Sequence, residues 1–253
     1  MVFAAPDISV VIPVFRNVET IEALYARLCT TLESSGLSFE LIFVNDACPM
    51  NSQAVLEQLA SKDERITVIE LSKNIGQHKT SLVGLAHATA NQVTALDADL
   101  QDPPEALPML IKGLESGYDV VFAGRRGKYQ SGQRLLSSRI FKKLLRLLTG
   151  IPLDAGTYWV ARRSVIDTIL HWQVARPHLV TLLGISGARL LSIPVERSSS
   201  PTGASGYTNW MRLKLGLEAI FLALQWRLGL ISFQPEFPLD KCPIKTRIGH
   251  RFL

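Results

Sequence analysis

The chain has 253 residues, of which 47% are hydrophobic and 19% are charged. This composition is typical of a folded globular protein and excludes an intrinsically disordered chain. The three cysteines (Cys29, Cys48 and Cys242) are too few and too scattered for a disulfide framework. The sequence contains no CxxC pair of the kind that would indicate a zinc site. Residues 1–7 contain neither a basic region nor a long apolar run, so we expect no secretory signal peptide and a location on the cytoplasmic side.

The net charge of +5 is concentrated in one segment. Residues 120–153 contain no carboxylate but carry Arg125, Arg126, Lys128, Arg134, Arg139, Lys142, Lys143 and Arg146. A basic field of this density indicates a phosphate-bearing partner, which could be a nucleotide diphosphate, a lipid phosphate, an anionic membrane or a nucleic acid. No recognised nucleic-acid-binding motif accompanies the charge, so we expect no nucleic-acid partner.

Buried strands alternate with amphipathic helices through the first half of the chain. Apolar runs predict strands over residues 8–14, 39–44, 66–71, 92–96 and 119–123. Helical spacing of apolar residues predicts helices over residues 21–35, 52–62, 77–90 and 103–114. This alternation predicts an α/β fold with a mainly parallel central sheet and helices on both faces.

The second half is less regular. The pattern predicts an amphipathic helix over 134–149, strands over 157–161 and 190–195, a polar loop over 197–207, and a last helix over about 209–230. Polar residues interrupt this last helix, so its apolar runs fall short of the roughly 20 residues that a membrane span needs. It could lie in a membrane interface or pack on the domain with its polar stripe in water. The tail over 241–253 has no clear periodicity.

Three polar clusters follow predicted strands, over residues 13–17, 45–49 and 97–105. In an open parallel sheet, ligands bind beyond the carboxyl ends of the strands. Asp97, Asp99 and Gln101 alternate, so in an extended segment their side chains face the same way and could share one Mg²⁺ or Mn²⁺ ion with substrate phosphates. The alternative is that Asp97 and Asp99 only cap the helix that begins near Pro103.

Four motifs together resemble the family 2 glycosyltransferases of the GT-A fold: VVIPVF at 10–15, VND at 44–46, LSKNIGQH at 71–78 and DADLQDPPE at 97–105. Within that family the chain is most similar to the polyprenyl-phosphate sugar transferases, the group of dolichyl-phosphate mannose synthase and the bacterial undecaprenyl-phosphate enzymes. The resemblance covers about residues 8–207. It implies a catalytic domain over 1–207, with a nucleotide-sugar half over about 1–124 and an acceptor half over about 125–207. Residues 208–253 are then an interfacial or packing helix and a tail.

The resemblance also implies roles for individual residues. The nucleotide would be held by Pro13, Phe15, Asn17, Asp46, Gln77 and Asp97. The metal and the diphosphate would be carried by Asp97, Asp99 and Gln101, with Arg125 on phosphate. Two positions depart from the family pattern: Arg16-Asn17-Val18-Glu19 follows the first strand in place of Asn-Glu, and Ser200 stands where an arginine is usual, so that Arg197 would have to substitute for it.

The acceptor decides whether the reaction needs a general base. A hydroxyl acceptor must lose a proton, whereas a lipid phosphate is already ionised and attacks directly. The chain has no Glu-Asp pair, which is the usual base motif of hydroxyl-directed members of the family. We therefore predict an inverting, metal-dependent transfer to a polyprenyl phosphate by an enzyme peripheral on the cytoplasmic face of the membrane. The resemblance implies that the acceptor phosphate would be bound by Arg125, Arg134, Ser137, Ser138, Arg139 and Arg197.

Three assignments stay open at this point. Asp99 and Arg125 are the predicted catalytic residues, and Asp154 is the base if the acceptor is a hydroxyl of a lipopolysaccharide, a polysaccharide or a small molecule. The chain could also be a non-catalytic nucleotide-sugar-binding subunit. His78 could touch substrate, although a single histidine at a helix start is more often a capping or packing residue.

Overall fold

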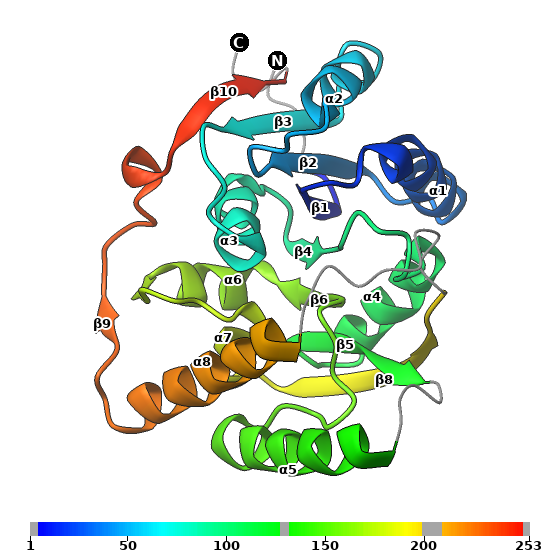
Figure 1. Cartoon of the computed structure of the whole chain (residues 1–253). Coiled ribbons are helices and arrows are strands. Elements are labelled where there is room, and N and C mark those ends of the chain that lie inside the picture. Colours follow the sequence, from blue (N-terminus) through cyan, green and yellow to red (C-terminus); the bar gives the residue numbers. More distant parts are fainter. Residues whose placement is uncertain (1–4, 127–131, 199–208, 250–253) are drawn as a thin grey trace.

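The computed structural model describes residues 5–126, 132–198 and 209–249, and for 125–126, 132–140, 209 and 211–212 the description is of the backbone. One twisted sheet runs through the molecule in the strand order β10-β3-β2-β1-β4-β6-β5-β8 (Figure 1). Its strands are β1 (Ile8–Val14), β2 (Phe39–Asn45), β3 (Ile66–Leu71), β4 (Gln92–Ala95), β5 (Val120–Arg126), β6 (Trp159–Arg162), β8 (Leu190–Glu196) and β10 (Ile244–Ile248).

The sheet is parallel from β3 through β2 and β1 to β4, and again between β5 and β8. Strand β6 is inserted antiparallel between β4 and β5, and β10 runs antiparallel along the outer edge of β3. A second, two-stranded sheet joins β7 (Trp172–Gln173) to β9 (Ser232–Phe233). The predicted mainly parallel central sheet is confirmed.

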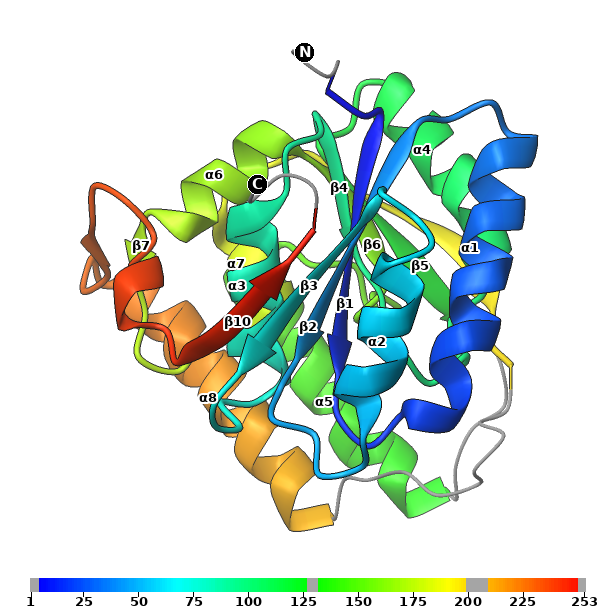
Figure 2. The same ribbon diagram turned by 90° about the horizontal axis from the view of Figure 1, so that it is seen from above.

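Helices cover both faces of the sheet (Figure 2). One face carries α1 (Ile21–Ser34), α2 (Ser52–Ala60) and α4 (Leu107–Glu115). The other face carries α3 (Gln77–His87), α5 (Gly132–Thr149), α6 (Arg163–Leu170), α7 (Leu179–Ile185) and α8 (Asn209–Arg227). Short 3-10 turns complete the described elements: η1 (Val18–Thr20), η2 (Pro104–Ala106) and η3 (Leu239–Lys241).

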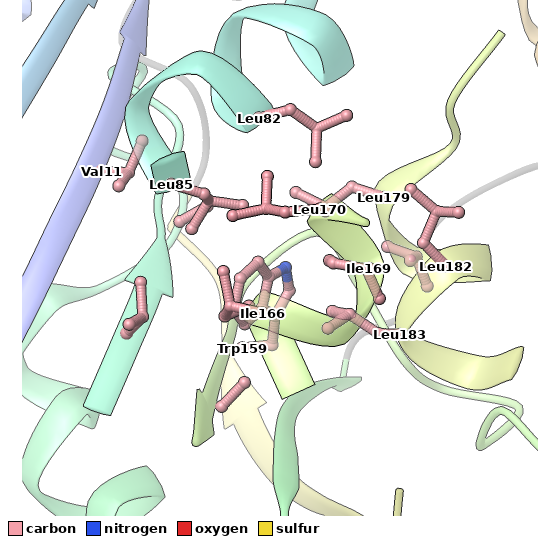
Figure 3. Packing of buried hydrophobic residues seen from close by; sticks show 14 of the residues in the cluster. Val11, Leu82, Leu85, Trp159, Ile166, Ile169, Leu170, Leu179, Leu182 and Leu183 are labelled. Carbon is pink, nitrogen blue, oxygen red and sulfur yellow. The ribbon is translucent and has the colours of Figure 1, made fainter. Parts of the chain in front are cut away.

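Strand β1 is buried on both faces, as a central parallel strand should be. Its residues Val10 and Ile12 pack into the cluster of α1, α2 and α4, whereas Val11 points the other way, toward Leu82 and Leu85 of α3 (Figure 3). Helix α3 approaches the sheet so closely that a Cβ added at Gly84 would lie 2.4 Å from Val11 Cγ1. Each face of the sheet therefore has its own apolar core.

Several elements differ from the prediction. Helices α6 and α7 and strand β10 were not expected, and the strand predicted from residue 157 begins only at Trp159. The helix predicted over 103–114 is a 3-10 turn followed by α4, and Pro103 stays extended (ψ 121°) because the proline that follows it disfavours the helical conformation. Helix α3 ends at His87, and α8 ends at Arg227.

Helix α8 packs on the domain through Leu222 and several small residues and presents most of its large residues to solvent. Ala219, Leu222 and Ala223 are buried against the core, and Phe141 of α5 lies against Gly216. The exposed large residues recur at helical spacing along the opposite side, at Trp210, Leu213, Leu217, Phe221 and Leu224. Among the helices that the structure describes, none is long and apolar enough to cross a bilayer.

Candidate active site

The polar clusters meet where the direction of the sheet's connections reverses. The chain leaves β1 and β2 for helices on one face and leaves β3 for α3 on the other, so β1 and β4 flank a switch point of the kind at which α/β proteins bind ligands (Figure 2). Backbone hydrogen bonds tie these strand ends together: Asp46 N donates to Val14 O at 3.0 Å, and Leu96 N donates to Val11 O at 3.0 Å. The loops after β1, β2 and β4 thus lie side by side.

Asp97 and Asp99 follow β4 and are both partly exposed, whereas Ala98 between them is 2% exposed. This alternation places the two carboxylates on the open side of the segment and the methyl group of Ala98 in the core. Gln101, two residues further on, is also partly exposed. The three residues that the motif proposes for a metal ion are therefore all accessible at the end of β4, although the turn at Leu100 interrupts the extended segment that the sequence predicted.

Asp97 is oriented from two sides. Gln77 Nε2, at the first residue of α3, donates to Asp97 Oδ1, and Thr157 Oγ1 lies 3.5 Å from Asp97 Oδ2. Sequence reasoning placed Gln77 near the nucleotide but missed Thr157, which enters the site because β6 pairs with β4. Gln77 also brings the N-terminus of α3 to the site, and the unpaired N–H groups and dipole of a helix N-terminus favour anions.

Asp46 holds the loop in front of α3. It is 2% exposed, and its carboxylate accepts hydrogen bonds from Ile75 N at 2.8 Å and Gly76 N at 3.1 Å. Gly76 has φ +86°, a conformation that a residue with a Cβ rarely adopts. The structure thus assigns Asp46 the task of shaping this loop, and the nucleotide contact implied by the resemblance stays a prediction.

The turn after Asp99 is strained. Leu100 has φ +59°, in the left-handed region, which for a bulky residue costs of order 1–3 kcal/mol and persists only where surrounding contacts hold it. Asp99 Oδ1 accepts a hydrogen bond from Gln101 N at 3.0 Å across this turn. Upstream, Thr20 Oγ1 donates to the carbonyl of Ala98. The orientation of Asp99 is therefore fixed by its own loop and by η1.

Arg197, at the end of β8, contacts the same loop. Its Nε lies 2.5 Å from Asp102 Oδ1, and its Nη2 donates to Asp102 Oδ2 at 2.9 Å. Both side chains are largely buried, with 15% of the arginine and 4% of the aspartate exposed. The structure thus places Arg197, predicted for the acceptor phosphate, in an ion pair with the segment that carries Asp99.

Asp154 lies at the far side of the site, in the loop before β6. Its carboxylate packs against Gly124 of β5 so closely that a Cβ at Gly124 would meet Asp154 Oδ2 at 2.3 Å and Ser192 Oγ at 2.5 Å. The loop from Asp154 to Thr157 connects this position to Asp97. Asp154 is partly exposed.

Three of the residues predicted to bind the nucleoside lie in β1 and the loop that follows it. Pro13 is buried within β1, Phe15 is 38% exposed, and Asn17 is partly exposed. Arg16 has φ +61°, and its guanidinium carbon lies 5.3 Å from the centroid of the Phe15 ring. This arrangement offers an aromatic face and a cation beside the ends of β1 and β2.

For the predicted phosphate-binding residues Arg125, Arg134, Ser137, Ser138 and Arg139, the side chains lie outside the described part of the structure. The backbone places Arg125 at the end of β5 and the other four in α5. Further along α5, Lys142, Lys143 and Arg146 are exposed. The role of the basic segment in phosphate binding therefore stays a prediction.

His78 packs against a second histidine. Its ring centroid lies 4.7 Å from that of His178, and Leu179 N donates to His78 Nδ1 at 3.4 Å. Burial lowers the pKa of His78 to about 4, and burial together with the neighbouring His78 lowers the pKa of His178 to about 3. Both rings are therefore neutral at pH 7. This geometry supports the packing interpretation of His78, and the sequence offered no signal that pairs two histidines 100 positions apart.

The carboxylates at the end of β4 suit a hard divalent cation. Within the described ranges, no three His, Cys, Asp or Glu side chains are grouped so that they could hold a metal ion. Mg²⁺ and Mn²⁺ usually take only one or two protein carboxylates and complete their shell with phosphate oxygens and waters. The two carboxylates of Asp97 and Asp99 with the amide of Gln101 thus fit an ion shared with a diphosphate.

The sheet and its switch point define an α/β protein that binds a ligand beyond the carboxyl ends of its strands. Comparison with known families specifies the class. Residues 9–170 match the model of glycosyl transferase family 2. The chain belongs to this family. The predicted family and the predicted glycosyltransferase class are confirmed, whereas the match does not reach the polyprenyl-phosphate subgroup.

Solved structures of glycosyltransferases share the fold. A mannosyltransferase from Pyrobaculum calidifontis in complex with GDP-Man and Mn²⁺ superimposes with a TM-score of 0.65 at 18% identity, over 88% of this chain and 65% of that one. Glucosyl-3-phosphoglycerate synthase from Mycobacterium tuberculosis, in complex with Mn²⁺, UDP and glucosyl-3-phosphoglycerate, gives 0.63 at 18% identity, over 93% and 91%. Mannosyl-3-phosphoglycerate synthase from Rubrobacter xylanophilus gives 0.65 at 16% identity, over 88% and 74%. This chain thus spans less than two thirds of the mannosyltransferase, and at such identities the likeness shows the fold alone.

Proposed function

We propose that the protein transfers one sugar from a UDP- or GDP-sugar to a polyprenyl phosphate at the surface of a membrane, and that it requires Mg²⁺ or Mn²⁺. The observation that carries the donor half of this proposal is the pair of partly exposed carboxylates, Asp97 and Asp99, at the end of β4. The acceptor half rests on the carboxylate-free basic helix α5 beside the outward apolar side of α8.

On the donor side, Asp97, Asp99 and Gln101 hold the cation together with the diphosphate. The cation, when bound, neutralises the charge that develops on the departing nucleoside diphosphate. Gln77 orients Asp97 and presents the N-terminus of α3 to phosphate oxygens. Pro13, Phe15, Asn17 and Asp46 form the side toward the nucleoside. The neighbouring structures with GDP-Man or UDP and Mn²⁺ support this arrangement.

On the acceptor side, an ionised phosphate oxygen attacks the anomeric carbon, the bond from that carbon to the diphosphate breaks, and the nucleoside diphosphate leaves. No proton has to be removed, so this acceptor needs cations and not a base. Arg125, Arg134, Ser137, Ser138 and Arg139 would bind that phosphate, because guanidinium forks and hydroxyls match phosphate oxygens. Attack opposite the leaving group inverts the anomeric configuration.

The membrane location is supported by α5 and α8 together. Lys142, Lys143 and Arg146 are exposed on α5, and α5 packs against α8, whose other side exposes large apolar residues. The one carboxylate of α8, Glu218, is paired with Arg176 at 3.3 Å. Basic residues near an anionic lipid surface contribute about 1 kcal/mol each. We propose that this combined surface rests on the lipid headgroups, with the chain peripheral on the cytoplasmic face.

A second candidate acceptor is a small phosphorylated molecule, and Asp154 would then be the base for its hydroxyl. It is favoured by the solved glucosyl-3-phosphoglycerate synthase, which has a TM-score of 0.63 and was determined with its phosphorylated product. Asp154 is partly exposed beside Gly124, as a base must be to reach an acceptor.

In the test, the full chain is incubated with Mn²⁺ and a labelled donor, either a UDP-sugar or a GDP-sugar. Two acceptors are supplied in separate reactions: vesicles that contain polyprenyl phosphate, and soluble phosphoglyceric acid. The proposal predicts label in the organic phase that mild acid releases rapidly, because a sugar phosphate linkage hydrolyses much faster than an ordinary glycoside. Acid-stable or water-soluble product would move the assignment to a hydroxyl acceptor. Binding of donor without turnover on any acceptor would identify a non-catalytic nucleotide-sugar-binding subunit.

A further inference from the structure

Arg197 and Asp102 join two segments that lie 95 positions apart in the chain. Asp102 belongs to the loop after β4, directly behind the strained turn at Leu100, and Arg197 follows the last residue of β8. Beside their ion pair, Ser198 N donates to Gln101 O at 3.0 Å. Two consecutive residues of one segment thus bind two consecutive residues of the other, and we call these four residues, Gln101, Asp102, Arg197 and Ser198, the clamp.

The clamp differs from the other ion pairs of the described chain in its burial. In the ion pair of the clamp, the side chain of Arg197 is 15% exposed and that of Asp102 is 4% exposed. The pair between Arg27 and Glu105 lies on the same segment, three residues after Asp102, and its side chains are 34% and 53% exposed. An exposed pair contributes little, but a buried ion pair with a hydrogen bond between Arg197 Nη2 and Asp102 Oδ2 fixes geometry, because breaking it leaves charge in a buried place. The clamp is therefore placed to hold a conformation that the loop alone does not favour.

The conformation in question is the left-handed backbone turn at Leu100. A left-handed bulky residue persists only where its surroundings determine it. On one side of Leu100 lies Asp99, whose carboxylate accepts from Gln101 N, and on the other side lies Gln101, whose carbonyl accepts from Ser198 N. Loss of the Arg197 side chain would remove its ion pair with the Asp102 carboxylate and weaken the attachment of this segment to the end of β8, so the turn could relax and Asp99 could rotate.

We propose that Arg197 is a positioning residue of the metal site, which acts through Asp102 to keep Asp99 and Gln101 in the orientation that a divalent cation with a diphosphate requires. In this role the guanidinium binds a carboxylate of the protein and not a phosphate of the acceptor. The inference rests on the proposed function, because it assumes that Asp99 binds the cation. Outer partners that orient metal ligands typically change metal affinity about 10- to 100-fold when removed.

The experiment compares the wild-type chain with the double variant Asp102→Leu with Arg197→Met. Removing both partners avoids a single buried charge, so the double variant should fold even where Arg197→Met alone does not. A second variant, Arg197→Lys, keeps the charge but loses the planar guanidinium and should show a partial effect. The matched control is Arg27→Gln, which breaks the exposed fork to Glu105 on the same segment. Thermal unfolding confirms that each variant is folded.

Two readouts separate positioning from mere stability. The first is the affinity for Mn²⁺ in the presence of UDP or GDP, by calorimetry, which should fall about 10- to 100-fold in the double variant and stay unchanged in Arg27→Gln. The second needs no metal: hydrogen exchange at the amides of Gln101 and Ser198 should accelerate in the double variant and not in the control.

Equal Mn²⁺ affinity in the wild type and the folded double variant would overturn the clamp proposal and leave the proposed function standing. The proposal would be overturned even if exchange accelerates, since the clamp would then be structural alone. If the wild-type chain binds neither nucleotide diphosphate nor Mn²⁺, the proposed function fails, and the clamp's role in a metal site fails with it.

Discussion

The half of the molecule around β1 to β4 differs from the half around α5 and α8 in how its charged and large apolar side chains are placed. In the first half, the carboxylates of Asp46, Asp97 and Asp99 each accept a hydrogen bond from a neighbouring group, and most large apolar residues are buried, with Phe15 an exception. In the second half, charged residues such as Lys143 and large apolar residues such as Leu217 face solvent. The difference indicates a preorganised site for a small polar ligand in one half and a contact surface for an extended partner in the other.

The largest expected effect is on the preorganised half. Asp99→Asn removes the negative charge that the cation requires while keeping the shape of the side chain, so turnover of donor with Mn²⁺ should fall about 10³-fold. The control is Asp240→Asn, an exposed carboxylate distant in sequence from the site, whose turnover should equal that of the wild type. Retained turnover in Asp99→Asn would remove Asp99 from the metal site.

A pair of leucine substitutions measures the contrast in burial directly. Leu28 of α1 is 0% exposed, and Leu217 of α8 is 59% exposed. Leu28→Ala should lower the free energy of unfolding by about 3 kcal/mol through lost burial and a cavity. Leu217→Ala should change it by less than about 0.5 kcal/mol. Urea unfolding of both variants gives the comparison, and a large loss from Leu217→Ala would show that its side chain is covered in solution.

The two histidines sit where α3 of the first half meets α7 of the second. In the unfolded chain each has a pKa near 6.5, and in the fold burial lowers these values to about 4 and about 3. Between these values the unfolded chain binds more protons, so stability is complete above about pH 6.5 and is lost as the pH falls. We expect the free energy of unfolding to be lower at pH 4.5 than at pH 7.5 by at least about 2 kcal/mol. Replacing both, His78→Gln with His178→Gln, should flatten this dependence, and an unchanged slope would assign it to other groups.

Substitutions on the exposed side of α8 should have the smallest effect on the free energy of unfolding, but they should weaken membrane binding. The double variant Leu217→Ser with Phe221→Ser should unfold like the wild type but partition at least about tenfold more weakly onto vesicles containing phosphatidylglycerol. The matched control is Ala223→Ser, on the buried side of the same helix. Equal vesicle binding in the outer double variant would refute the proposed membrane contact, and a change in sedimentation from dimer to monomer would show that a second copy covers this side.

Much of the first half could be predicted from the sequence because its elements carry clear periodicity. The strands β1, β2 and β3 are continuous apolar runs, and the residues that face inward from α1 follow helical spacing. The position of Asp97 and Asp99 at a strand end followed from the same pattern. What the pattern could not supply is Thr157, because its place beside Asp97 depends on the antiparallel insertion of β6.

The second half resisted prediction for physical reasons. Helix α6 has only eight residues and α7 only seven, too short for a periodic signal, and β10 is exposed over most of its length. Helix α8 is apolar on several sides, so its sequence did not reveal which side is buried. Gly216, Ala219 and Ala223 could have indicated it, since small residues permit close packing. The clamp between Asp102 and Arg197 left no trace in local sequence.

Strand β10 has a consequence for the handling of this protein. By pairing with β3 it occupies the backbone groups of a strand that would otherwise offer an open template to another molecule. Strand β10 itself carries the exposed charged residues Lys245 and Arg247, and charged side chains on an edge strand discourage further strands from adding. Shortened versions that omit residues 244–248 should therefore be prone to self-association even when the remaining core folds.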